Sequence, residues 1–218
     1  MASAREEFGR GPVLFVPGDI PWAETRALRR FVARAEGSSA DVATPHWESG
    51  ETEHLVQYHR SPATVRTLPW RRTRSLPFRR ASEFLRASPR TLLVSISTLT
   101  DRPESFSHVT YPTDAQRPAL RGRAGPPRTD REIEGAPKRW YGMAQAAWSA
   151  GSLREAARAF AKESRWYEGA GLGLLAWHSL LDASHAAGAD PEVLSACARL
   201  ERRFPRSRAA PETVNRAG

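Results

Sequence analysis

The sequence predicts a small α/β (or α+β) domain followed by an all-α domain, and two features of the 218-residue chain indicate this division. In the first half, short apolar runs alternate with amphipathic segments, as strands alternate with helices in α/β domains. In the second half, a helix–turn–helix pattern occurs twice with a spacing of 37 residues. A period of this length is typical of stacked helical hairpins. We therefore expect an α/β domain over residues 10–112 and a helical domain over residues 137–206.

The first half contains three candidate strands and two candidate helices in alternating order. The apolar runs Pro12–Val16 and Thr91–Leu99 predict buried strands, and the alternating run His54–His59 predicts a third. Segment 19–36 places its apolar residues on one face of a helix, and Ser82–Ala87 predicts a second, short helix. The pattern leaves the strand directions of the sheet open.

Residues 113–136 are rich in Pro, Gly and Arg and poor in apolar residues. This composition is typical of a linker or a long surface loop between two domains. Residues 207–218 follow the helical domain, and we expect them to form a flexible tail.

The first copy of the repeated pattern covers residues 140–160, which read W-Y-G-M-A-Q-A-A-W-S-A-G-S-L-R-E-A-A-R-A-F. Gly151 can end the first helix of this copy, and Phe160 lies on the apolar face of the second helix. In the second copy, Trp177 and Gly188 correspond to Trp140 and Gly151. The first helix of the first copy has one apolar face, formed by Trp140, Met143, Ala144 and Ala147.

This arrangement resembles a tetratricopeptide repeat, in which a large residue opens the first helix, small residues line the helix crossing, Gly precedes the turn, and Ala and then an aromatic residue follow. The resemblance covers residues 137–206. Glu163 and Glu168 depart from it, because the family has Ala and Pro at those positions. The resemblance implies two helical hairpins that bind protein partners. The alternative is a four-helix bundle whose internal repeat arose by chance.

Positive charge is concentrated in one segment of the chain. Residues 60–90 contain nine arginines and a single acidic residue, Glu83, so they carry +8 of the net +9. Within this segment the sequence Leu-Pro-aromatic-Arg-Arg occurs twice. Guanidinium forks match phosphate oxygens and aromatic rings stack on bases, so the segment predicts a polyanion-binding surface. Its candidate contact residues are Arg66, Trp70, Arg71, Arg72, Arg74, Phe78, Arg79 and Arg80.

The arginine-rich segment has two other interpretations. Its side chains contact acidic proteins or lipid headgroups, or they form a solvated face that binds nothing. The sequence has no RNP aromatics, GXXG loop or zinc-finger spacing, so it matches no recognised nucleic-acid module.

A second candidate interface lies in the helical domain, where a dense apolar cluster flanks the Gly-rich segment 169–173. Two repeats leave their end faces uncovered, and either the same chain or a second subunit must cap them. We expect a homo- or hetero-oligomer in which this cluster contacts the partner. The candidate partner-binding residues are Trp166, Tyr167, Leu172, Leu174 and Leu175.

Signatures of catalysis, metals and cofactors are weak, and we predict no catalytic residue, no metal ion and no cofactor. Histidines and glutamates crowd into residues 46–59, and their spacing matches no known metal motif, although the sequence alone does not decide whether they bind a metal ion. Cys197 is the only cysteine, which excludes an intrachain disulfide, and we expect it in the core.

The chain has no apolar run long enough for a membrane span and no signal-peptide pattern, so we expect a cytoplasmic protein. Its 31 arginines against 2 lysines indicate a GC-rich, bacterial genome. Three functions are compatible with these features: a non-catalytic adaptor or assembly subunit, an RNA- or DNA-associated subunit, and a small or degenerate enzyme with a helical appendage. We favour the adaptor.

Overall fold

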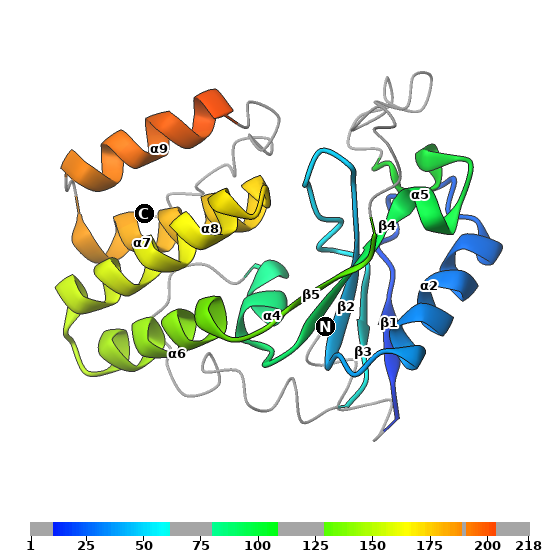
Figure 1. Ribbon diagram of the computed structural model, residues 1–218, viewed down its shortest axis with the longest axis horizontal. Helices are drawn as coiled ribbons and strands as arrows, with labels where there is room; N and C mark the ends of the chain where they lie inside the picture. The colour runs from blue at the N-terminus through cyan, green and yellow to red at the C-terminus, as the bar shows by residue number, and fades with distance from the viewer. Residues whose placement is uncertain (1–10, 62–79, 109–128, 189–190, 204–218) are drawn as a thin grey trace, which may run out of the picture.

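The computed structural model describes residues 11–61, 80–108, 129–188 and 191–203. In these residues the chain forms a five-stranded mixed sheet followed by four consecutive helices (Figure 1). The predicted order, α/β before all-α, is confirmed. The predicted tail 207–218 lies outside the described residues.

The sheet has the spatial order β1-β3-β2-β4-β5. The central strands β2 and β4 are parallel, and every other pair is antiparallel. The strands span Val13–Phe15 (β1), Val42–His46 (β2), Gln57–His59 (β3), Thr91–Ser95 (β4) and Arg131–Ile133 (β5). All five strands are short, so the helices and loops packed against the sheet must bury most of its surface.

Two predicted strands are too long, and two strands of the sheet were not predicted. Of the run His54–His59, only Gln57–His59 forms a strand. The run Thr91–Leu99 is not one strand, because it turns into the short helix α5 (Ile96–Leu99) after Ser95. There, the Thr98 hydroxyl donates to the Ser95 carbonyl (2.8 Å), a local bond that competes with an extended backbone. Strand β2 was not predicted, because it contains Pro45, and β5 lies inside the predicted linker 113–136.

Each face of the sheet is covered by helices (Figure 1). Helix α2 (Thr25–Gly37) and α5 cover one face, where Ala43, Leu92 and Val94 join a core with Phe31. On the opposite face, alternate residues such as Val42 and Leu93 join the core of the C-terminal helices. The sheet and the C-terminal helices thus share one hydrophobic core.

Helix α4 (Ser82–Ala87), at the predicted position, lies between the sheet and the C-terminal helices. A 3-10 turn, η2 (Pro103–Phe106), follows α5. The C-terminal helices are α6 (Ala136–Ser149), α7 (Leu153–Gly169), α8 (Gly173–Ala187) and α9 (Pro191–Arg203).

Helices α6 to α9 pack in chain order, each against the next. Gly151 and Gly188 both have positive φ (79° and 67°), the conformation that ends a helix with a glycine. The turn after Gly151 is short, so α6 and α7 run antiparallel (Figure 1).

The buried face of α6 differs from the predicted one. Tyr141 and Ala144 are buried on this helix, whereas Met143 is 61% exposed and Trp140 is only half-buried. The face is rotated because α6 must contact both α7 and α4. Phe160 on α7 is fully buried, as expected.

We predict that Phe160→Ala lowers the free energy of unfolding by about 3 kcal/mol, because it leaves a cavity in a fully buried site. The matched control is Met143→Ala on the exposed side of α6, with an expected change below about 0.5 kcal/mol. Urea denaturation measures both, and equal midpoints for the two variants would contradict the assignment.

Candidate functional site

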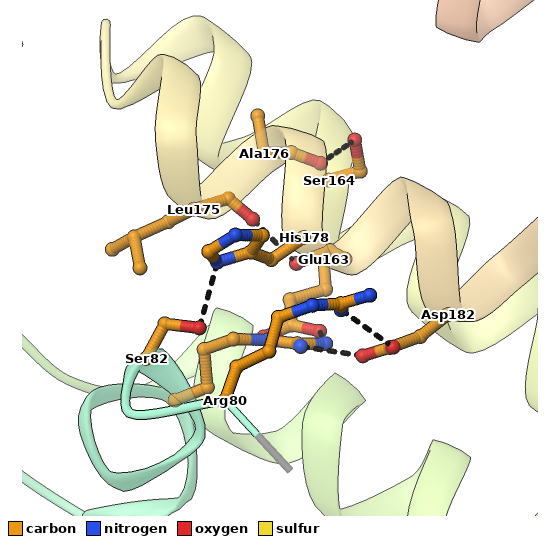
Figure 2. A network of polar contacts seen from close by, with 10 residues as sticks. Arg80, Ser82, Glu163, Ser164, Leu175, Ala176, His178 and Asp182 are labelled. Carbon is orange, nitrogen blue, oxygen red and sulfur yellow. Dashed lines mark hydrogen bonds and ion pairs between the residues drawn. The ribbon is translucent and has the colours of Figure 1, made fainter. Parts of the chain in front are cut away.

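Buried charged side chains gather where α4 meets α6, α7 and α8 (Figure 2). The guanidinium of Arg86, on α4, is completely buried. Its Nε donates to Glu163 Oε1 at 2.9 Å and its Nη2 to Glu163 Oε2 at 2.7 Å. Its Nη1 donates to Asp182 Oδ2 at 2.5 Å. One guanidinium thus joins α4 to both α7 and α8.

Arg80, which precedes α4, extends this arrangement. It is 8% exposed, and its Nη1 donates to Asp182 Oδ1 at 3.1 Å, so both carboxylate oxygens of Asp182 accept from arginines (Figure 2). We call Arg80, Arg86, Glu163 and Asp182 the arginine–carboxylate cluster. Its two cations and two carboxylates balance, as buried charges must.

Two aromatic rings line the Arg86 guanidinium. Its Cζ lies 4.8 Å from the ring centroid of Tyr141 and 5.5 Å from that of Phe160, distances at which cations and rings attract. Burial alone would lower the pKa of Arg86, but Glu163 and Asp182 outweigh burial and raise this pKa well above its ordinary value. Arg86 therefore keeps its positive charge, while burial raises the pKa of Glu163 and the charge of Arg86 opposes that shift.

Lys138 on α6 gives α4 a further polar contact. Its Nζ donates to the Leu85 carbonyl of α4 and to Thr91 Oγ1 (2.8 Å). Burial lowers the pKa of Lys138 to about 7, although the charge of Glu163 opposes this shift. Lys138 can donate both bonds in either protonation state.

Ser82 and His178 share a hydrogen bond of 2.7 Å between Oγ and Nδ1 (Figure 2). A hydroxyl beside an imidazole is also the pairing of serine hydrolases. Here Ser82 is fully buried, and burial, with Arg80 and His54, lowers the pKa of His178 well below its ordinary value. A general base works best with a pKa near the ambient pH. The hydrogen bond joins α4 to α8.

A second polar cluster lies at the carboxyl ends of β2 and β4, the position where α/β sheets hold ligands. Glu48 Oε1 accepts from Ser95 Oγ (2.5 Å) and Ser97 Oγ (2.7 Å). Nearby in sequence, Glu53 accepts from the Trp47 indole and contacts His108 Nε2 at 2.7 Å. These bonds fix the loop after β2.

The histidine- and glutamate-rich segment 46–59 is divided among separate contacts. His59 Nε2 lies 2.8 Å from Gln57 Oε1, and the His54 ring packs edge-on against His178. Among the residues that the structure describes, no three His, Cys, Asp or Glu side chains gather as a metal site would require.

Most predicted polyanion contacts lie outside the described residues, namely Arg66, Trp70, Arg71, Arg72, Arg74, Phe78 and Arg79. Arg80 is described, and its expected place at the surface is wrong, because it is buried against Asp182.

The predicted partner-binding cluster is not an exposed patch either. Trp166 is half-buried, and the other four side chains lie in the core of the chain itself: Tyr167, Leu172, Leu174 and Leu175.

The sequence prediction missed Arg86 and Asp182, which carry no local pattern. Glu163 did carry a signal, since it replaces the alanine of the repeat pattern. Glu168, the other departure, accepts a forked pair of bonds from Arg199 on α9 at 3.2 and 3.0 Å. Both departures from the pattern are thus carboxylates that join helices through arginines.

Comparisons of the chain with protein-family models, curated proteins and solved structures give no match. In the described part of the chain, no helix combines the length and apolar character that crossing a bilayer requires.

The buried acid Glu83 makes the stability depend on pH. Burial, and next the charge of Asp182, raise the pKa of Glu83 to about 7, while Arg86 and Arg80 oppose the shift. The ordinary value is 4.5, so between these values the unfolded chain releases a proton that the folded chain keeps. Folding stability therefore falls as pH rises from about 4.5 to about 7.

We predict that Glu83→Gln, which mimics the protonated acid, stabilises the protein at about pH 8 and has little effect at about pH 4. The gain at the higher pH is at most about 3 kcal/mol, since one pKa unit corresponds to about 1.4 kcal/mol. Chemical denaturation at both pH values measures it, with the exposed Glu155→Gln as control. Equal effects at both pH values would refute the shift.

Proposed function

We propose that this chain is a non-catalytic, cytoplasmic adaptor or assembly subunit, which binds protein partners through tetratricopeptide-like helical hairpins. Supporting this proposal, α6 to α9 pack in chain order, as helices of stacked repeats do. A glycine with positive φ follows each of α6, α7 and α8, which allows short turns between successive helices.

The observation that carries the proposal is the core that the sheet shares with the C-terminal helices. Val42, Leu93 and Ile133 of the sheet belong to the same buried cluster as residues of α6 to α9. This core holds the sheet and the helices as one body, and the arginine–carboxylate cluster adds ion pairs between α4 and the helices. A body of this kind can hold partners in a fixed relative position, which is what an adaptor requires.

The outer side of α6 is the best candidate docking surface. Met143 is 61% exposed there, beside the exposed Gly142 and Ala146 and the half-buried Trp140. A large apolar side chain next to small residues allows a partner to approach the helix closely. At the far end of the helices, on α9, Leu194 is 51% exposed and offers a matched comparison.

We predict that Met143→Glu abolishes recovery of a stoichiometric partner when the tagged protein is purified from its native cells, because it places a charge in an apolar interface. Leu194→Glu is the control, with the same chemical change on α9, and should retain the partner. Quantitative mass spectrometry measures both. If wild type recovers no stoichiometric protein, or if Met143→Glu recovers it unchanged, the proposal fails.

A second candidate function is polyanion binding by residues 66–79 of the arginine-rich segment, and the contacts of Arg60 and Arg80, on either side of these residues, support it. Arg60 Nη2 donates to the carbonyls of Ala35 and Ser38, both at 2.7 Å. Arg80 is held by Asp182. Arg60 and Arg80, on either side of residues 66–79, are thus anchored to the folded body.

We predict that replacing Arg71, Arg72, Arg74 and Arg79 by Ala flattens the salt dependence of RNA or heparin binding, because fewer counterions are released. The control replaces four exposed arginines of the helical part, with the same change in net charge: Arg139, Arg154, Arg158 and Arg165. Equal slopes for the two variants, or no binding by wild type at low salt, would contradict the prediction.

A further inference from the structure

The helical hairpins form a pocket around one arginine side chain. Tyr141 from α6, Phe160 and Glu163 from α7, and Asp182 from α8 all contact the guanidinium of Arg86. Two carboxylates that accept hydrogen bonds from a guanidinium, with aromatic rings near it, are the groups that recognise arginine. All four side chains belong to the hairpins, and the arginine belongs to α4, so the contact has the form of a receptor and a ligand.

Helix α4 is weakly built compared with its surroundings. It has six residues, whereas isolated helices shorter than about 12–15 residues are marginal in water. Its buried residues are Ser82, Glu83, Leu85 and Arg86, of which only Leu85 is apolar. Buried polar contacts of this kind contribute more to specificity than to net stability.

The hairpins have a core of their own without α4. Tyr167, Leu172, Leu175 and Leu180 belong to the large core cluster, and α7 packs against both α6 and α8. Removal of α4 would nevertheless leave Glu163 and Asp182 buried without their arginines, which is costly. Release of α4 is therefore favourable only if another arginine takes the place of Arg86.

We propose that the pocket of Tyr141, Phe160, Glu163 and Asp182 is an arginine-recognition site that α4 fills as an internal ligand, and that an arginine-bearing helix of a partner protein exchanges with α4 there. The positions of Arg80 and Arg86 define the matching partner, which carries two arginines six positions apart. The inference rests on the adaptor function and names the chemistry of its partner.

The first test is hydrogen exchange on the wild-type chain. The amides of Ser88 and other residues at the end of α4 should exchange through an opening that leaves α7 and α8 protected. If these amides exchange only with global unfolding, at the same free energy as those of α7 and α8, then α4 is an integral part of the core and the proposal is wrong.

The second test uses a labelled synthetic peptide of residues 80–88 with the full-length Arg86→Ala chain, whose pocket lacks its own arginine. The peptide should bind saturably and raise the melting temperature of the variant. A peptide with Arg86→Lys should bind at least about tenfold more weakly, because lysine lacks the guanidinium fork. Adding Glu163→Gln to the protein should also weaken binding.

If the folded Arg86→Ala protein does not bind the peptide, the proposed replacement of α4 by a partner helix is wrong. If that variant does not fold, the peptide is added in excess to wild type, where faster exchange of the α4 amides supports the proposal and unchanged exchange refutes it. Dimers without peptide would show that a second copy is the occupant and not a different protein. The two proposals can fail separately. If the peptide does not bind but recovery of the partner still depends on Met143, the exchange of α4 is rejected and the adaptor function is retained.

Discussion

The ion pair between Arg86 and Glu163 is the contact on which the arrangement of this protein depends. It joins residues that lie 77 positions apart in the chain, with both side chains completely buried. Such a pair is costly to form, because both charges lose their water, and costly to break, because either partner alone would be stranded. It therefore selects one position of α4 against the helices more strongly than it adds to the overall stability.

The surroundings of this pair explain why its position is so closely defined. Asp182 accepts from both Arg80 and Arg86, so a displacement of either arginine disturbs the other. Lys138 holds the backbone of α4 at Leu85, and Ser82 is bonded to His178. Apolar packing alone tolerates sliding, whereas these bonds each require a specific distance and direction.

Local sequence patterns predicted the parts of the fold that depend on local physics. Ser82–Ala87 was placed correctly as a helix, and the glycines after α6 and α8 mark the helix ends because only glycine adopts positive φ freely there. The apolar period also predicted Phe160 in the core. The register of α6 was wrong, because its buried face is set in part by α4, which is distant in sequence.

The candidate site was hidden from sequence for the same reason, since Arg86 and Asp182 meet only in the folded chain. The charge count over residues 60–90 included nine arginines, but two of them, Arg80 and Arg86, neutralise carboxylates from the second half of the chain. A charge count along the sequence therefore overstates the surface charge wherever buried pairs join distant segments.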